Sequence, residues 1–224
     1  RGELVFEVKG KPAAVVSKLR GTSELSPTVT HCAQVGATLA RMHLAGHDFP
    51  LSQPNLRALP WWNDTVPVVL PYLTKSQTSL IQQELAYQNH VNASSSFAAL
   101  PRGPIHADLF RDNVVFDSAQ GEAVLSGFFD FYFAGDDTWV FDLAVCLNDW
   151  CIDLLTHTHQ ALLAHSFIAS YNTVRPLQRA ERELLPAMLR AAALRFWISR
   201  LWDFHMPREA SILKAHDPGH FEQV

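Results

Sequence analysis

The hydrophobic positions along the chain change their period several times, and these changes predict its elements. Near the start, apolar and charged residues alternate at residues 4–8, Lys-Gly-Lys follows at residues 9–11, and a second apolar run covers residues 12–19. This order predicts a β-hairpin that turns at Gly10. Further along, apolar residues recur at three- and four-residue steps, which indicates helices. The expected helices cover residues 28–45, 76–92, 140–155, 158–171 and 180–205.

Proline positions and short apolar runs predict what lies between these helices. Ser26 and Pro27 are a suitable N-cap and first residue for the helix at 28–45, and Pro186 should kink the last helix or delay its start. Residues 48–60 contain three prolines and are expected to be loop, whereas residues 61–72 are ambiguous between loop and short helix. Short β-like runs are expected at residues 105–108, 114–117 and 123–129. The pattern therefore predicts an α+β fold, mostly helical, with a small β insertion.

Composition and charge narrow the class of protein. The chain has 224 residues, 48% of them apolar and 18% charged, which is enough for a packed core. A net charge of −4 without a Lys/Arg block argues against a nucleic-acid partner. No apolar run approaches ~18 residues, so we expect no membrane span, and the first 11 residues lack the apolar segment of a signal peptide. The three cysteines lie in apolar surroundings without metal spacing, which is typical of a reducing compartment, and we expect a cytoplasmic protein.

One short segment carries the pattern of a catalytic loop. His106 to Asn113 reads His-Ala-Asp-Leu-Phe-Arg-Asp-Asn, which fits the H-x-D-x-x-x-x-N catalytic loop of kinases. A loop between two strands can direct Asp108 at an incoming hydroxyl, while Asn113 turns back to hold a magnesium ion. Asp130 lies within a Phe-Asp-Phe sequence after a β-like run and supplies a second oxygen ligand. The alternative is that these residues only cap or turn loops. His106 is expected to brace the loop and not to do chemistry.

The same segment resembles a known group of enzymes. Residues 104–117 and 125–133 look like the catalytic core of the aminoglycoside phosphotransferase-like, or choline kinase-like, small-molecule kinases. Phe-Asp-Leu-Ala at residues 141–144 and Leu-Asn-Asp-Trp-Cys at residues 147–151 are most similar to the homoserine kinase family within that superfamily. The resemblance implies a protein kinase-like fold and the cofactors ATP and Mg²⁺. It also implies phosphoryl transfer to the side-chain hydroxyl of L-homoserine, giving O-phospho-L-homoserine, a step in threonine biosynthesis.

The resemblance implies a role for each matching residue of the loop. Asp108 would be the catalytic base or the group that orients the hydroxyl. Asn113 and Asp130 would hold magnesium, and Asp142 would brace the catalytic loop from the following helix.

The resemblance also implies where ATP binds. Residues 15–19 would join the two lobes of the kinase, with the backbone of Val16, Ser17 and Leu19 facing the adenine edge. Val115 would form an apolar floor beneath the base.

The acceptor requires groups of both charges. Homoserine is a small zwitterion, so its carboxylate needs a cation and its ammonium needs an anion or an aromatic face. Arg195 is a candidate for the first, and Asp149 or Trp150 for the second. A surface arginine or a structural ion pair is the favoured alternative for Arg195, and Asp149 could instead cap or brace its own helix.

The resemblance divides the chain into two parts. Residues 1–19 would be a remnant hairpin and hinge of the N-terminal lobe, and residues 20–224 the helical C-terminal lobe. The sequence contains no G-x-G pair, and Lys9 and Lys11 lie too close to the hinge to serve as the phosphate-binding lysine. We therefore expect a truncated form with weak or no ATP binding alone, which self-associates through surface left by the missing lobe.

Two alternatives to a homoserine kinase stay open: a kinase of choline, methylthioribose or an aminoglycoside, or a noncatalytic remnant that acts as a binding module.

Overall fold

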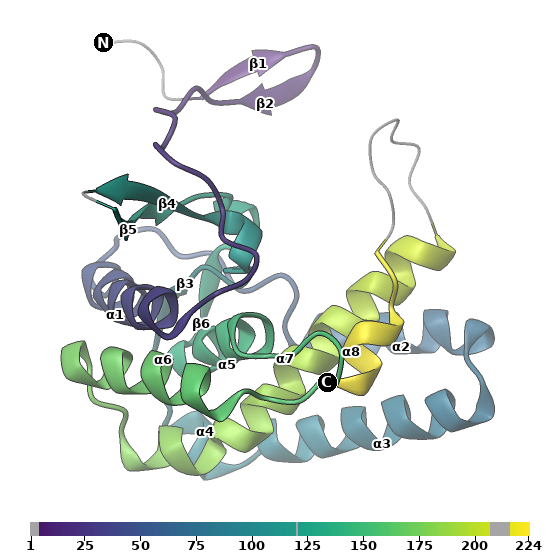
Figure 1. Ribbon diagram of the computed structural model, residues 1–224. Coiled ribbons are helices and arrows are strands. Elements are labelled where there is room, and N and C mark those ends of the chain that lie inside the picture. The colour runs from purple at the N-terminus through teal and green to yellow at the C-terminus, as the bar shows by residue number, and fades with distance from the viewer. Residues whose placement is uncertain (1–4, 120, 207–215) are drawn as a thin grey trace.

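Helices make up most of the molecule, two small antiparallel sheets lie among and beside them, and a third, N-terminal hairpin stands away from them (Figure 1). The computed structural model describes residues 5–119, 121–206 and 216–224. The helices are α1 Val29–Ala45, α2 Leu59–Val69, α3 Lys75–Asn92, α4 Ser95–Ala98, α5 Trp139–Trp150, α6 Ala161–Val174, α7 Arg179–His205 and α8 Gly219–Gln223. The strands are β1 Phe6–Val8, β2 Lys11–Ala13, β3 Arg102–Ile105, β4 Val114–Ala119, β5 Glu122–Phe128 and β6 Gly135–Thr138. Short 3₁₀ turns cover Leu70–Tyr72, Arg111–Asn113 and Phe131–Phe133. The predicted α+β class, mostly helical, is confirmed.

The N-terminal hairpin turns where the glycine predicted it. Lys9 and Gly10 have φ angles of 51° and 75° between the antiparallel strands β1 and β2. The second strand ends at Ala13, so the strand expected over residues 12–19 is shorter than predicted, and residues 14–19 have no regular structure. Leu4, the expected start of the first strand, lies outside the described residues. Because few side chains of residues 5–18 are buried, tertiary packing does little to extend these strands.

The chain rejoins the body of the protein at β4. The backbone groups of Thr22 and Phe116 exchange two hydrogen bonds, of 3.0 and 2.9 Å. Gly21, just before this pair, has φ +98°, and a Cβ there would overlap the carbonyl group of Phe116. Glycine is therefore required where the chain crosses β4.

Two apolar clusters meet at α5, which contributes residues to both. Val140, Ala144 and Val145 face the cluster shared with α2 and α7, whereas Leu143 and Leu147 face the cluster shared with α1 and α6. This helix is apolar almost all round, as expected of a helix covered on every side. It therefore provides a rigid support for any polar residue that it carries toward the catalytic loop.

Several expectations about element boundaries were wrong, among them the helix expected at 158–171, which is α6. The strand expected at 105–108 lies three residues earlier, as β3. It pairs with β6, an acidic Gly-Asp-Asp-Thr strand whose sequence has no apolar pattern. Helix α1 is capped by Thr28, in a capping box with His31, and not by Ser26. Helix α7 begins at Arg179, close to the expected start, so Pro186 does not delay it, because the packing of the later turns outweighs one missing backbone bond. Helix α5 ends at Trp150 and not at 155, and the Asp153 carboxylate accepts the N–H groups of Leu155 and Thr156 in a turn beyond it.

Among the described helices, none combines the length and the apolar character that crossing a membrane requires.

Candidate active site

Asp108 lies at the end of β3, on a loop held by a buried carboxylate from α5. The backbone N–H groups of His106 and Ala107 donate to Asp142 Oδ2 and Oδ1, at 2.9 and 2.8 Å. Ala107 has φ 64°, a left-handed conformation that costs an L-residue about 1–2 kcal/mol. The two charge-assisted bonds offset this cost and turn the chain sharply before Asp108. The side chain of Asp108 remains 20% exposed.

Asp142 is itself held by a chain of buried polar groups. His43 Nε2 of α1 lies 3.0 Å from Asp142 Oδ2, and His43 Nδ1 lies 2.8 Å from the hydroxyl of Tyr171 on α6. Burial raises the pKa of Asp142, but the hydrogen bond and charge of His43, together with the His106 contacts, outweigh it and lower the pKa. Three helices thus position one carboxylate. Sequence reasoning missed His43 and Tyr171, although a histidine on the apolar face of a helix signals a buried polar partner.

Hydrogen bonds also join Asn113 and Phe129, the residue before Asp130, to the loop. Asn113 Nδ2 donates to the carbonyl of Asp108 at 2.8 Å, and the Asn113 carbonyl accepts the N–H of Phe129 at 3.1 Å. His106 Nε2 contacts the carbonyl of Phe129 at 2.9 Å. The next residue, Asp130, is exposed and left-handed, with φ 61° and ψ 60°. The structure therefore brings the regions of Asp108, Asn113 and Asp130 together.

Asn113 and Asp130 offer oxygen atoms, the ligand type that a hard cation such as Mg²⁺ prefers. The bond from Asn113 Nδ2 turns the amide oxygen away from Asp108, and Asp130 offers a carboxylate. Within the described residues, no group of three His, Cys, Asp or Glu side chains is arranged to hold a metal ion. Magnesium commonly keeps several water or phosphate ligands and needs only one or two carboxylates from the protein.

The electrostatics of Asp108 suit proton transfer near neutral pH. Burial raises its pKa to about 7, opposed by Arg195 and reinforced by Asp112 and Asp130. Arg195 Nη1 lies 3.7 Å from Asp108 Oδ1. Burial lowers the pKa of Arg195 to about 10, with Asp108 opposing the shift, so the guanidinium stays charged at pH 7. Arg195 is 3% exposed and is not a surface arginine.

Asp149 and Trp150 support the loop from the other side. Asp149 Oδ2 accepts the N–H of Arg111 at 2.7 Å and its Nε at 3.2 Å. The Trp150 indole donates to the carbonyl of Leu109 at 3.0 Å, and its side chain is fully buried in the core. Both side chains therefore contact the catalytic loop, and their contact with the ammonium group of the acceptor stays a prediction.

The residues expected to contact adenine are only partly brought together. A Cβ at Gly127 would lie 3.1 Å from Leu19 methyl carbons, so Leu19 packs over β5. Val115 pairs with Gly127 in the β4–β5 ladder and lies next to this contact. Val16 is 84% exposed and Ser17 is also exposed, so neither side chain packs against the body of the protein.

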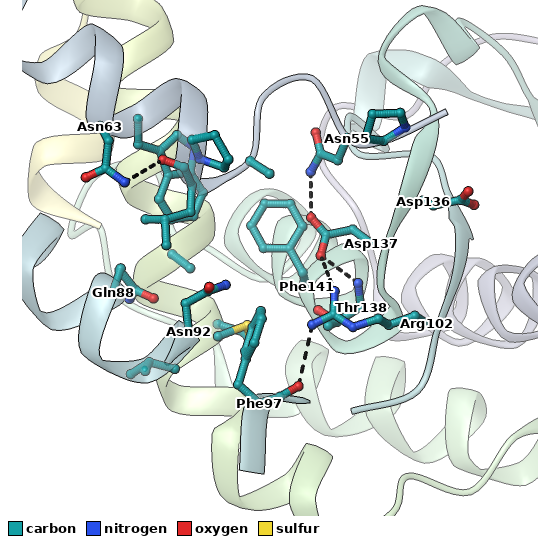
Figure 2. A pocket seen from close by; sticks show the side chains of 18 residues that line it. Asn55, Asn63, Gln88, Asn92, Phe97, Arg102, Asp136, Asp137, Thr138 and Phe141 are labelled. Carbon is teal, nitrogen blue, oxygen red and sulfur yellow. Dashed lines mark hydrogen bonds and ion pairs between the residues drawn. The ribbon is translucent and has the colours of Figure 1, made fainter. Parts of the chain in front are cut away.

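A cavity of about 540 Å³ lies at the opposite end of the β3–β6 ribbon (Figure 2). Arg102 and Thr138, which pair at that end, line it, whereas Asp108 follows Ile105 at the other end. Asp137 is held there by Asn55 Nδ2 at 2.8 Å and by Arg102 at 3.7 Å (Figure 2). The cavity is thus separate from the catalytic loop.

Comparison with known proteins places the chain in a family. A profile of the Phosphotransferase enzyme family (APH) matches residues 1–184. Over its whole length the chain is 64% identical to a homoserine kinase of Polaromonas naphthalenivorans (strain CJ2), of which it covers 70%, and 56% identical to one of Burkholderia mallei (strain SAVP1), of which it covers 69%. The chain therefore belongs to the phosphotransferase enzyme family and, within it, to the homoserine kinase family.

Solved structures agree with the fold. Amicoumacin kinase hAmiN, in complex with AMP-PNP, Ca²⁺ and Ami, superposes with a TM-score of 0.64 at 16% identity over 94% of this chain. An ethanolamine kinase of Plasmodium vivax gives 0.60 at 12% identity over 97% of the chain. The chain spans 65% and 64% of those two proteins. The expected kinase-like fold is confirmed.

Proposed function

We propose that the protein transfers the γ-phosphoryl group of ATP to the side-chain hydroxyl of L-homoserine, giving O-phospho-L-homoserine and ADP. Membership of the homoserine kinase family supports the reaction and the acceptor. The observation that carries the proposal is the position of Asp108, partly exposed on a loop that the buried Asp142 holds rigidly. Phosphoryl transfer depends mainly on positioning and charge stabilisation, and such a loop supplies positioning.

Asp108 is the proposed catalytic base. Its carboxylate orients the acceptor hydroxyl and takes its proton as the hydroxyl oxygen bonds to the γ-phosphorus and the bond to ADP breaks. A pKa of about 7 allows Asp108 to hold that proton and release it after the transfer. Asn113 and Asp130 are the proposed ligands of Mg²⁺, which when bound neutralises charge on the phosphates.

The remaining contacts of the nucleotide stay proposals. Leu19 and Val115 form the apolar contact for adenine, and the backbone of Val16 and Ser17 faces its edge. The division into residues 1–19 and 20–224 follows from the same proposal. Self-association stays a prediction, which sedimentation of the chain tests. The free and fully buried thiols support the proposed cytoplasmic location.

An ADP-release assay with a panel of acceptors tests the proposal. The sequence has no G-x-G pair to hold the phosphates, so binding of Mg-ATP and turnover by this chain alone are expected to be weak. Any turnover is expected to be faster with L-homoserine than with choline, methylthioribose or an aminoglycoside. Asp108→Asn is expected to lower turnover by about 10²–10⁴-fold without changing the affinity for Mg-ATP. The control is Asp112→Asn, a change at an exposed neighbour in the same loop, which is expected to keep turnover close to that of the wild type.

Calorimetric titration with Mg-ATP measures nucleotide binding separately. Wild-type turnover by Asp108→Asn would refute the assignment of the base, and a preference for another acceptor would refute homoserine. Binding of Mg-ATP and homoserine without any turnover would favour a binding module.

A further inference from the structure

We infer that Arg195 binds the carboxylate of the acceptor and thereby selects amino-acid acceptors. The inference rests on the proposed kinase function and adds a specificity residue to it. The observation behind it is that the buried guanidinium of Arg195, beside Asp108, has N–H groups without hydrogen-bond partners among the described residues.

Arg195 is buried without the partners that a buried guanidinium requires. Its Nε and Nη2 have no hydrogen-bond partner among the described residues. Its Nη1 lies 3.7 Å from Asp108 Oδ1, which is longer than the ~2.7–3.2 Å of a hydrogen bond. Leaving donors of a charged group buried and unpaired is costly, so such groups call for an explanation.

Arg111 and Arg175, which are also buried in the described part of the chain, show how this protein satisfies a structural guanidinium. Arg175 binds both oxygens of Glu181, at 2.9 and 3.0 Å, and donates to the Tyr171 hydroxyl at 3.2 Å. Arg111 is likewise paired, with Asp149 and with the carbonyl of Leu25. Arg195 differs from both because its Nε and Nη2 groups have no hydrogen-bond partner among the described residues.

The aromatic rings around Arg195 contact its guanidinium but offer no hydrogen-bond acceptor in the plane of the group. Its guanidinium carbon lies 3.7 Å from the ring centre of Phe196 and 5.0 Å from that of Phe133. Aromatic faces attract the charge yet accept no N–H in the plane of the guanidinium. Phe133 ends the short 3₁₀ turn that follows Asp130. Because the unpaired nitrogens are covered, we expect this turn to move when the acceptor binds.

The missing partner matches a carboxylate on the acceptor. A carboxylate presents two oxygens in one plane, which fit the fork of a guanidinium. In homoserine three carbons separate the hydroxyl from the carboxylate, so one molecule can place its hydroxyl at Asp108 and reach Arg195. A phosphate of the nucleotide is the other anion that comes near Asp108, and the test separates the two.

Two acceptors that differ only in the carboxylate provide the test. L-Homoserine and 3-aminopropan-1-ol share the hydroxyl and the amine, and only homoserine carries the carboxylate. Ligand-detected NMR titrations of the whole chain measure both affinities, and ADP release gives kcat/KM for both. Arg195→Gln is expected to weaken homoserine binding about 10- to 100-fold and to change aminopropanol binding less than about twofold. Arg195→Lys keeps the charge but not the fork, and an intermediate loss for homoserine alone is expected.

Arg179→Gln is the matched control, because Arg179 is an exposed arginine of the same helix with one ion pair. It is expected to change neither affinity. Equal losses for both acceptors in the Arg195 variants would overturn the inference, since Arg195 would then act on Asp108, the phosphates or the fold. Unchanged homoserine binding would also overturn it. If Arg195→Gln fails to fold, the ratio of the two affinities in Arg195→Lys decides. Failure of the wild-type chain to bind homoserine would instead refute the proposed function.

Discussion

Asp142→Asn removes the charge that holds the catalytic loop and keeps the shape of the side chain. Asp142 Oδ2 accepts from the His106 N–H and from His43 Nε2, and Oδ1 accepts from the Ala107 N–H. Asparagine has one acceptor oxygen and one donor nitrogen, so its amide N–H₂ must oppose at least one of these donors. The least costly arrangement places the oxygen at the Oδ2 position and leaves the Ala107 N–H unpaired.

The size of the effect follows from these three bonds. An unpaired buried donor costs about 1–3 kcal/mol, and the two remaining bonds weaken because their acceptor is no longer charged. We expect a total loss of about 2–4 kcal/mol in the free energy of unfolding. At about 2–4 °C per kcal/mol for a chain of this size, Tm falls by roughly 5–15 °C.

Urea unfolding at pH 7, followed by circular dichroism, measures this loss, and Asp112→Asn serves as an exposed control expected to stay within about 0.5 kcal/mol. The pH dependence provides a second measurement. The pKa of Asp142 is lowered in the folded protein, so its contribution to stability is complete above the unfolded value of about 3.9 and is lost as the pH falls through the folded value. Asp142→Asn has no carboxylate at this position and therefore lacks this pH-dependent contribution to stability. A loss no larger than that of the control would refute the account of the loop.

Three further results are expected. Gly36→Ala should lower stability by about 1–3 kcal/mol, because its Cβ would overlap the carbonyl of Phe167 between α1 and α6, whereas Gly46→Ala, whose nearest neighbours would lie at 3.4 Å, should leave Tm nearly unchanged. Burial, with help from the nearby Arg200, lowers the pKa of His220 to about 4, so the wild type should lose stability as the pH falls from about 6.5 toward 4. An equal dependence of stability on pH in His220→Gln would contradict this. All three cysteines are fully buried, so a thiol reagent should label none of them in the native chain and three in denaturant; rapid labelling of the native chain would contradict the packing.

Sequence by itself determined the features that depend on neighbouring residues. The turn at Gly10 and the helical periods are local, because each depends on backbone preferences within a few residues. The spacing of Asp108, Asn113 and Asp130 can be read directly from the sequence. The resemblance of the loop and of residues 141–151 was enough to predict the family. The acidic strand β6 escaped prediction because its stability comes from pairing with β3, which its own side chains do not indicate.

Tertiary structure alone decided which polar side chains are buried and with whom. Trp150 belongs to the core, and His43 and Tyr171 hold Asp142, because α1, α5 and α6 meet at that point. The sequence favoured a surface or structural role for Arg195, and only the packing of α7 beside the loop reveals a buried guanidinium next to Asp108 with donors left over. Burial and hydrogen-bond pairing depend on contacts between residues that are distant in sequence, so a local sequence pattern does not predict them.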